Sequence, residues 1–539
     1  MLTMRTHSEN IRRRFVTTSL LVLLTVTSYG LGDVFTSSNK ITELAASEGS
    51  MLDALNTYIR DQYDSLVGLS QFLSERSKAV HLEPERDHRQ QVEHPNGAYF
   101  LIKHFNKRWH QLTQTHPGLA TQLTQKKVSL PADSDYKGSL SSLIRLQRVY
   151  RLSHHDMYNG NYSGYHGPPL DVEDAFLLGR QAFVDGFLIE AIEWLQLAVD
   201  LMQLRISNSP AAALSFSRAA SLLGRAYIFV NNKTKAQEML DLSKDLEPNG
   251  GDVVQLKKEL AGEAIPHYGH SNQTWHHNMS VLCLRPKEQR VEKTHPWHVC
   301  RYRTARGLPY LRYKEEILSL APFVSLFYNI VHDTEIDNIK QFVKGRMFRG
   351  QVGQGKDAKT AKIRTSDLGW VHDRELETTK TVSQRVKVIT GLEVDQRAPL
   401  GPSSAEAMQV VNYGLGGHYD AHMDPFENPS TCGMLKQSGN RIATFLMYLT
   451  DVEKGGSTVF LNSAISVSPI KGMALFWYNY APAMEEEDKL TKHAGCPVLI
   501  GQKWIANKWL WTYGNTFRRP CGPHPESTQL DVERILTHD

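Results

Sequence analysis

The chain has 539 residues, of which 41% are hydrophobic, and this is enough for about three domains with apolar cores. Its 61 basic and 57 acidic residues leave a net charge of +4, which argues against a nucleic-acid-binding footprint. Apart from one apolar stretch near the N-terminus, no segment approaches the length of a membrane span.

Residues 1–32 have the layout of a signal peptide. A run of arginines from Arg12 precedes a short apolar stretch, residues 15–26, and small residues follow up to Gly32. We predict cleavage near Gly32, with Asp33 as the first mature residue. An uncleaved signal anchor is the alternative, although the apolar stretch is short and rich in threonine.

Residues 33–150 show the spacing of amphipathic helices, with apolar side chains three and four positions apart. The stripe contains Leu44, Met51, Leu55, Tyr58, Ile59, Tyr63, Leu66, Leu69 and Phe72. By itself the stripe indicates only that these helices pack together, and packing within the chain is one open interpretation.

Residues 151–262 predict a TPR-like α-helical domain. Small and large apolar residues recur at helical spacing in 175–183 and 191–198, and again in 222–227 and 236–240. This pattern is typical of paired helices in tetratricopeptide repeats. We therefore expect two helical hairpins here.

Residues 263–316 are polar and irregular in pattern, which predicts a linker, and they contain Cys283 and Cys300. The chain has five cysteines, so at least one is free or intermolecular. Cys432 lies in a loop rich in Pro, Ser and Gly and is interpreted as a surface thiol.

Four sequons predict N-glycosylation if the chain enters a secretory lumen. They lie at Asn161, Asn232, Asn272 and Asn278, all before residue 317. Asn428 is excluded because a proline follows it.

Residues 317–539 show short alternating strands separated by Gly and Pro, which predicts an all-β sandwich or barrel. Within this region, residues 407–413 are strand-like. Gly414, Gly416 and Gly417 then permit a sharp turn.

A candidate metal site follows this turn. His422 and Asp424 are two residues apart, so on a strand they point to the same side, and His493 lies far enough downstream to arrive on a neighbouring strand. Two histidines and one carboxylate form the facial triad of non-haem Fe(II) oxygenases.

The same pattern occurs by chance at His154-His155-Asp156, since the chain has 23 histidines. This second match precedes a loop rich in Gly, Tyr and Asn and has no strand signal. We therefore interpret it as a decoy rather than a metal site.

Lys503 follows His493 by ten residues and is flanked by the apolar Trp504 and Ile505. A lone lysine is usually a solvated surface charge. At the inner end of a β pocket, however, a cation can pair with a dicarboxylic acid whose other end chelates iron.

These motifs resemble those of the catalytic α subunit of collagen-type prolyl 4-hydroxylase. The resemblance is carried by residues 409–417, His422-x-Asp424, and the segments 440–444, 455–460, 476–479, 493–494 and 518–521. The family is a group of Fe(II)- and 2-oxoglutarate-dependent dioxygenases of the endoplasmic reticulum lumen, which also use L-ascorbate.

The resemblance implies a multidomain α+β fold. An N-terminal helical dimerisation region (33–150) precedes a TPR-like peptide-substrate-binding domain (151–262), a disulfide-stapled linker (263–316) and a double-stranded β-helix, or jelly-roll, catalytic domain (317–539). Similarity to this family implies the other interpretation of the helical stripe, a coiled coil that dimerises two chains.

The resemblance also implies roles for single residues. His422, Asp424 and His493 would bind Fe(II), and Lys503 would bind the distal carboxylate of 2-oxoglutarate. The remaining assignments are Tyr413 and Thr444 for 2-oxoglutarate, and Tyr419, Arg441 and Trp509 for the peptide.

Disulfides and a partner are implied in the same way. Cys283 would pair with Cys300 and Cys496 with Cys521, which leaves Cys432 unpaired. The implied partner is protein disulfide isomerase, as the β subunit of an α2β2 tetramer.

The chain departs from the family on the substrate side. Its expected groove carries Phe187, Leu188, Ile189, Arg225, Tyr227 and Ile228 where the collagen enzymes are richer in tyrosine, and Trp511 stands where relatives commonly carry histidine. The leading hypothesis is C4 hydroxylation of peptidyl proline in collagen-like or proline-rich secreted chains. The alternatives are the same chemistry on a different peptide and a catalytically silent peptide-binding adaptor.

Overall fold

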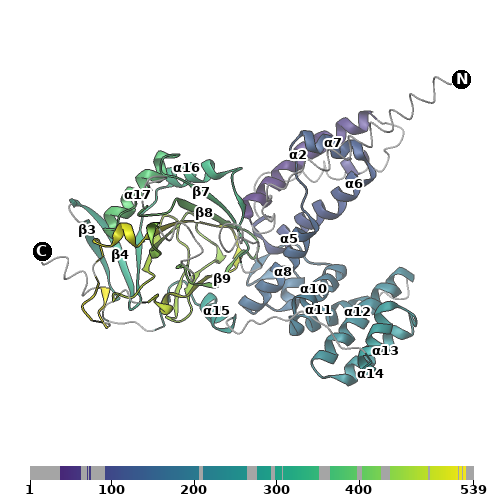
Figure 1. The fold of residues 1–539 in the computed structure, drawn as a ribbon. Coiled ribbons are helices and arrows are strands. Elements are labelled where there is room, and N and C mark those ends of the chain that lie inside the picture. The colour runs from purple at the N-terminus through teal and green to yellow at the C-terminus, as the bar shows by residue number, and fades with distance from the viewer. Residues whose placement is uncertain are drawn as a thin grey trace.

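A computed structural model describes residues 37–529, with several gaps. The gaps are 62–68, 71, 75–91, 205–209, 264–275, 293–295, 297, 306–307, 351–363, 397–402, 427–436, 484–485, 520 and 525. The predicted signal peptide, Asn272 and Cys432 lie outside the described residues. A helical N-terminal half lies beside a β-rich C-terminal half (Figure 1).

Helix α2 (Ser38–Asp61) opens the described chain and packs on the short helices that follow it. These are α5 (Pro95–His104), η3 (Phe105–Trp109), α6 (His110–Thr115) and α7 (Pro117–Gln125). Met51 and Leu55 of the predicted stripe are buried in one cluster with Phe105 and Trp109. The described residues of the stripe therefore pack within the chain, Tyr63 and Leu66 lie outside the described ranges, and a coiled coil with a second copy stays a prediction.

The predicted helical hairpins are present. After α8 (Asp133–Tyr150), α9 (His154–Tyr158) and the small hairpin of β1 (Asn161–Tyr162) and β2 (Tyr165–His166), the chain forms α10 (Val172–Asp185), α11 (Leu188–Gln203), α12 (Pro210–Phe229), α13 (Lys233–Lys244) and α14 (Gly251–Ala261). Gly179 lies against Leu195, so the missing side chain lets α10 and α11 approach closely. No helix in the described part of the chain combines the length and apolarity needed to cross a membrane.

The stretch expected to be an irregular linker contains regular structure. Helix α15 (His276–Cys283) is followed by the antiparallel strands β3 (Cys300–Ala305) and β4 (Leu308–Leu320). Charged residues hide the strand pattern in the sequence, because Arg301 and Arg303 reach across the pair to Glu315.

The implied disulfide pairing is wrong. Cys283 forms its disulfide with Cys496, and Cys300 and Cys521 are free and exposed. The physical reason is placement: Cys283 ends α15 inside the core that also contains Cys496, whereas Cys300 begins β3 at the outer edge of a sheet. The disulfide therefore ties α15 to the segment that follows β15 (His493–Gly495).

The described part of the C-terminal half contains two main antiparallel sheets and one two-stranded sheet, consistent with a jelly roll. The large sheet has the order β3, β4, β5 (Phe323–Tyr328), β14 (Ala474–Tyr478), β10 (Arg441–Tyr448), β17 (Lys503–Trp511), β8 (Met408–Tyr413), β7 (Asp367–Val371) and β6 (Phe348–Arg349). The smaller one has the order β13 (Ile465–Val467), β12 (Thr458–Phe460), β15 and β9 (Tyr419–His422), and a short pair joins β11 (Lys454–Gly455) to β16 (Val498–Ile500).

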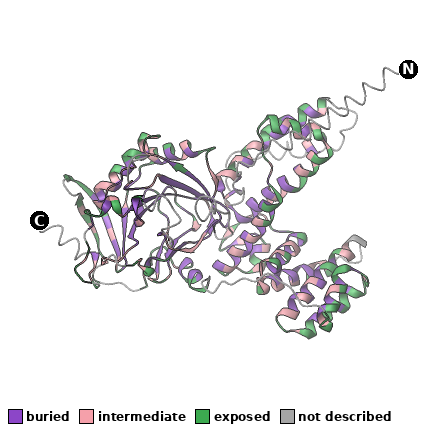
Figure 2. Ribbon diagram, viewed as in Figure 1, coloured by how far each residue is buried: buried purple, intermediate pink, exposed green. Residues whose placement is uncertain are grey.

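Both faces of the large sheet are covered. One face packs on the smaller sheet, where Leu446 and Trp477 contact the cluster of Phe460. The other packs on α16 (Asp333–Val343) and α17 (Glu377–Thr390). Strand β17 is therefore buried along its whole length, as is its neighbour β8 (Figure 2), which explains why the sequence of β17 shows little alternation.

Candidate active site

The three predicted metal ligands meet between the two sheets. His422 ends β9, Asp424 follows two residues later, and His493 begins β15 directly opposite His422. The expectation that His493 arrives on a neighbouring strand is confirmed. Asp424 lies just past the end of β9 rather than on it.

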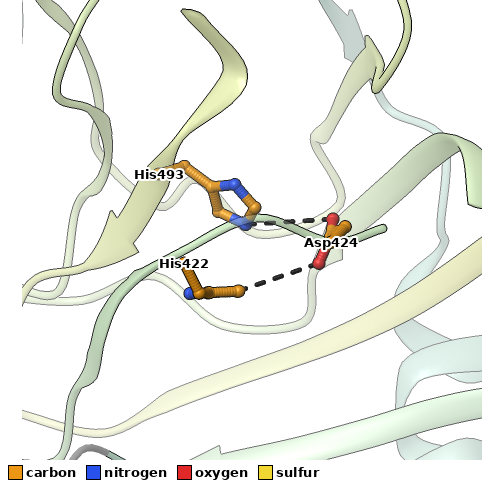
Figure 3. Close-up of side chains that lie close together, drawn as sticks. All are labelled: His422, Asp424 and His493. Atoms are coloured by element: carbon orange, nitrogen blue, oxygen red, sulfur yellow. Dashed lines mark ion pairs between the residues drawn. The ribbon is translucent and has the colours of Figure 1, made fainter. Parts of the chain in front are cut away.

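The ligand atoms converge on one point (Figure 3). One atom from each of the three side chains lies within 4.8 Å of the others. Nε2 of His422 is 3.8 Å from Oδ1 of Asp424, and Nε2 of His493 is 3.8 Å from Oδ2. This donor set suits a divalent iron ion, since two imidazoles and one carboxylate leave other coordination positions open.

Backbone carbonyls set the tautomer of both histidines. Nδ1 of His422 donates to the carbonyl of Asp420 at 2.7 Å, and Nδ1 of His493 donates to that of Thr491 at 3.0 Å. Each Nε2 therefore carries the lone pair that a metal requires. Burial, followed by the neighbouring His493, lowers the pKa of His422, which favours the neutral form.

A chain of hydrogen bonds orients Asp424. The Thr444 hydroxyl donates to Oδ2 of Asp424 at 2.5 Å and accepts from Asn479 Nδ2 at 3.1 Å. Trp477 Nε1 in turn donates to Asn479 Oδ1 at 2.8 Å. Burial by itself would raise the pKa of Asp424, but the neighbouring His493, His422 and Arg441 and the Thr444 hydrogen bond outweigh it. The pKa of Asp424 is therefore below its usual value, and the carboxylate form prevails.

Lys503 lies at the inner end of the same space. It begins β17 opposite Tyr413 of β8, and its Nζ is 5.4 Å from the Tyr413 ring centre. Among the described residues, no acidic side chain forms an ion pair with it. Burial lowers the pKa of Lys503 to about 7.

One pocket joins these groups. It is lined by Arg364, Tyr413, Tyr419, His422, Asp424, Thr444, Leu446, Thr458, Trp477, His493, Gly495, Lys503, Ile505, Asn507 and Trp509. The structure thus brings together the triad and five of the six other predicted site residues. In the strand register, Thr444, the hydrogen-bond partner of Asp424, lies opposite Trp509, which is six residues along β17 from Lys503. This separation suits a ligand with an anionic group at each end.

Arg441 is the predicted site residue that does not line the pocket. It forms an ion pair with Glu406, and its guanidinium lies 3.8 Å from the centre of the Trp509 ring. Its NH1 also donates to the backbone carbonyl of Asp424 at 3.2 Å. Arg441 therefore supports Trp509 and Asp424 from behind.

Arg364 is a charged pocket residue that the sequence did not indicate. It precedes β7, far from the motifs, and no local pattern distinguishes it. Its guanidinium donates to Gln409 at 2.9 Å and lies 4.7 Å from the ring centre of Tyr419, and the Tyr419 ring also stacks on His422 with ring centres 3.6 Å apart. Only the tertiary fold brings it to the site.

Two further sequence observations have clear positions. Trp511 does not line the pocket; it is buried and stacks on Phe426, with ring centres 6.2 Å apart. At the decoy, His154 lies 3.7 Å from Glu193. Within the described ranges, the triad is the only group of three or more His, Cys, Asp or Glu residues close enough to share an ion.

Comparison with protein families gives two matches. Residues 37–164 match the family described as Prolyl 4-Hydroxylase alpha-subunit, N-terminal region. Residues 408–511 match the 2OG-Fe(II) oxygenase superfamily. The second match spans β8 to β17 and so contains the triad and Lys503.

Similar proteins match nearly the whole chain. Prolyl 4-hydroxylase subunit alpha-3 of Mus musculus is 31% identical over 92% of this chain and 96% of its own length. Subunit alpha-2 of Gallus gallus is 30% identical over 91% and 95%, respectively. Among solved structures, the viral collagen prolyl hydroxylase of Paramecium Bursaria Chlorella virus-1 aligns at 24% identity over 35% of this chain and 95% of its own, with a TM-score of 0.28.

Proposed function

Because the chain belongs to the family of prolyl 4-hydroxylase α subunits, we propose that it hydroxylates C4 of peptidyl proline in collagen-like or other proline-rich secreted chains. It is a 2-oxoglutarate-dependent dioxygenase, for which the family implies Fe(II) and 2-oxoglutarate. The observation that carries the proposal is one pocket with the triad at one end and the buried Lys503 at the other.

The residues of this pocket would have different roles. His422, Asp424 and His493 would hold the iron, and Lys503 would pair with the distal carboxylate of 2-oxoglutarate. When bound, the metal and cosubstrate supply the oxidising chemistry, with O2 as second cosubstrate and L-ascorbate as reductant. Within the chain, the hydrogen bond from Thr444 would orient the metal ligand Asp424, and burial of the pocket would exclude water.

The peptide would enter from the side of Tyr419 and Trp509. Both line the pocket, and Nε1 of Trp509 is buried without a hydrogen-bond partner among the described residues, so it is available to a substrate carbonyl. Tyr413 packs beside Lys503 and would border the 2-oxoglutarate end instead.

A second peptide contact is assigned to the TPR-like helices α10 to α12. Aromatic rings suit an extended polyproline II ligand. The rings of Phe183 and Phe229 lie 5.7 Å apart, and the guanidinium of Arg148 lies 4.0 Å from the ring of Phe187. Val184 and Ile189 of the same helices are exposed apolar residues.

We place the chain in the lumen of the endoplasmic reticulum, with protein disulfide isomerase as its β subunit in an α2β2 tetramer. The buried disulfide supports an oxidising compartment. The sequons support entry into a secretory lumen. Asn278 is exposed, and Asn161 and Asn232 are partly buried.

Two observations favour the alternative of a different peptide substrate. Phe187 and Phe229 of the helical region are partly exposed, and Trp511 with Phe426 forms an apolar stack next to Arg441. A silent adaptor is disfavoured because the metal ligands and Lys503 are intact and converge.

The test uses the full chain coexpressed with protein disulfide isomerase. Collagen-like and other proline-rich peptides are incubated with Fe(II), 2-oxoglutarate and ascorbate, and hydroxyproline is located by tandem mass spectrometry. We expect 4-hydroxyproline in at least one peptide and none with the His422→Ala variant. Succinate formed with a peptide that gains oxygen on another residue type would overturn the proline assignment and support the alternative.

A further inference from the structure

The N-terminal end of α2 lies directly on the catalytic sheet, although 373 to 375 residues separate the two segments. Oδ1 of Asn412 on β8 accepts from the Ser37 hydroxyl at 2.5 Å and from the Asn39 backbone N–H at 3.1 Å. Its Nδ2 donates to the Ser38 hydroxyl at 3.2 Å. Asn412 is fully buried, so the start of α2 supplies the partners that this amide needs.

An ion pair reinforces the contact. Nζ of Lys40 is 2.8 Å from Oδ2 of Asp367, whose side chain is 0% exposed. Asp367 of β7 lies directly opposite Asn412 in the strand register. A carboxylate buried this deeply requires a nearby cation, because desolvation penalises the lone charge. We call Ser37, Ser38, Lys40, Asp367 and Asn412 the α2 clamp.

Gly414 allows the chain to approach this closely. A Cβ at this position would lie 2.5 Å from the backbone nitrogen of Ser38 and 2.6 Å from the carbonyl carbon of Ser37. Gly416, by contrast, has a φ of +57° and meets the expectation of a turn residue. The absent side chain of Gly414 therefore serves docking of the helical region.

The clamp lies next to the strand positions that carry Tyr413 and Lys503 of the pocket. Asn412 is opposite Trp504 in the β8–β17 register, and the next pair is Tyr413 with Lys503. Adjacent residues of a strand point to opposite faces of the sheet. The clamp therefore contacts the face of β8 and β17 that is opposite to the one carrying Tyr413 and Lys503. The Ser38 hydroxyl also donates to Gln502, the residue before Lys503, at 3.2 Å.

We propose that the α2 clamp is a positioning device for 2-oxoglutarate, holding β8 and the start of β17 where Tyr413 and Lys503 meet the cosubstrate. The inference rests on the proposed pairing of Lys503 with the distal carboxylate. Its residues touch no substrate; they act through the two strands. Small displacements of a charged group in a binding site cost affinity steeply, so a local effect on 2-oxoglutarate is expected.

The test compares Lys40→Met with Lys103→Met in the full chain coexpressed with its isomerase partner. Lys103 is a matched control, because its ion pair with Asp174 is 2.6 Å long and equally buried, with 20% and 0% exposure against 17% and 0% for Lys40 and Asp367. The control pair lies wholly within the helical region.

We expect Lys40→Met to raise the KM for 2-oxoglutarate about tenfold and to change the KM for peptide less than about twofold. The 2-oxoglutarate-induced rise in melting temperature, measured without peptide, should shrink in parallel. Lys40→Arg should restore most of both values, and Lys103→Met should lower the melting temperature without changing the KM for 2-oxoglutarate. Ser38→Ala, a milder change, should follow Lys40→Met with a smaller effect.

Equal effects of Lys40→Met and Lys103→Met on the KM for 2-oxoglutarate, or no effect of Lys40→Met and Ser38→Ala, would overturn the proposal. Lys503→Ala is measured in parallel. If Lys503→Ala leaves this KM unchanged, the pairing with the distal carboxylate fails and the clamp proposal fails with it. If Lys503→Ala raises the KM while the clamp variants do not, only the clamp proposal fails.

Discussion

The hydroxyl of Thr444 donates a 2.5 Å hydrogen bond to Oδ2 of Asp424. The same oxygen faces Nε2 of His493 at 3.8 Å, so the bond fixes the carboxylate while leaving its other lone pair toward the metal position. Thr444 is thus a partner of a metal ligand, in addition to lining the pocket.

Replacing Thr444 by valine keeps the shape of β10 and removes this hydrogen bond. Loss of such a partner typically weakens metal binding roughly 10- to 100-fold, because the ligand is no longer oriented. We expect a rise of that order in the Fe(II) concentration for half-maximal turnover. Thr379→Val is the control, since Thr379 is a buried threonine of α17 whose hydroxyl donates to the Leu376 carbonyl, away from the pocket. An unchanged iron requirement in Thr444→Val would contradict the role.

Single alanine substitutions of His422, Asp424 and His493 should abolish succinate formation. Each removes one of three ligands, and the remaining two cannot hold the ion at ordinary concentrations. Circular dichroism should show a preserved fold. His154→Ala, at the second His-x-Asp match, should retain wild-type turnover. Loss of turnover in this variant would show that His154 also contributes to catalysis.

Lys503→Ala should raise the KM for 2-oxoglutarate, since the distal carboxylate would be buried without a cation. Removing one member of a buried ion pair costs about 3–5 kcal/mol, which corresponds to a factor of roughly 100 or more. Lys508→Ala is a useful comparison, because this buried lysine of the same strand pairs with Asp373 outside the pocket. A normal KM in Lys503→Ala would remove the residue from its assigned role.

Binding of 2-oxoglutarate should depend on pH through Lys503. Burial lowers the pKa of its ammonium to about 7 in the ligand-free protein, so above that pH the free side chain is mainly neutral. Pairing with a carboxylate requires the charged form and takes up a proton. The dissociation constant should therefore rise roughly tenfold per pH unit above about pH 7.5.

Calorimetric titrations in buffers of different ionisation enthalpy would measure this proton uptake directly. The free energy of unfolding of the ligand-free protein should depend on pH in the opposite sense. Between pH 7 and the ordinary lysine pKa, the unfolded chain binds more protons at Lys503 than the folded chain does. The folded protein therefore gains stability from this group as the pH rises through that range. Proton-independent binding would show that Lys503 is already charged before the ligand arrives.

The disulfide assignment can be tested by peptide mapping without reduction. We expect a cross-linked peptide that contains Cys283 and Cys496, and alkylation of Cys300 and Cys521 in the folded protein. A cross-link between Cys283 and Cys300 would restore the pairing implied by family resemblance.

Much of the site was predictable from local sequence. Strand periodicity predicted that His422 and Asp424 share a side of the chain, although Asp424 lies just past the end of β9, and the chemistry of the triad follows from residue type alone. The apolar neighbours of Lys503 indicated burial, which the structure confirms. Each of these conclusions depends on residues a few positions apart.

The remaining features depend on contacts between distant segments. Arg364 enters the pocket, Cys283 meets Cys496 and Ser37 meets Asn412 only because whole surfaces pack together, and no local pattern encodes which surfaces those are. Local residue patterns were enough to predict the metal chemistry and the helical and β character of the two halves. They could not predict which groups complete the pocket or which contacts support its walls. These features depend on burial and polar pairing between distant segments, which favour one arrangement among several that local propensity does not distinguish.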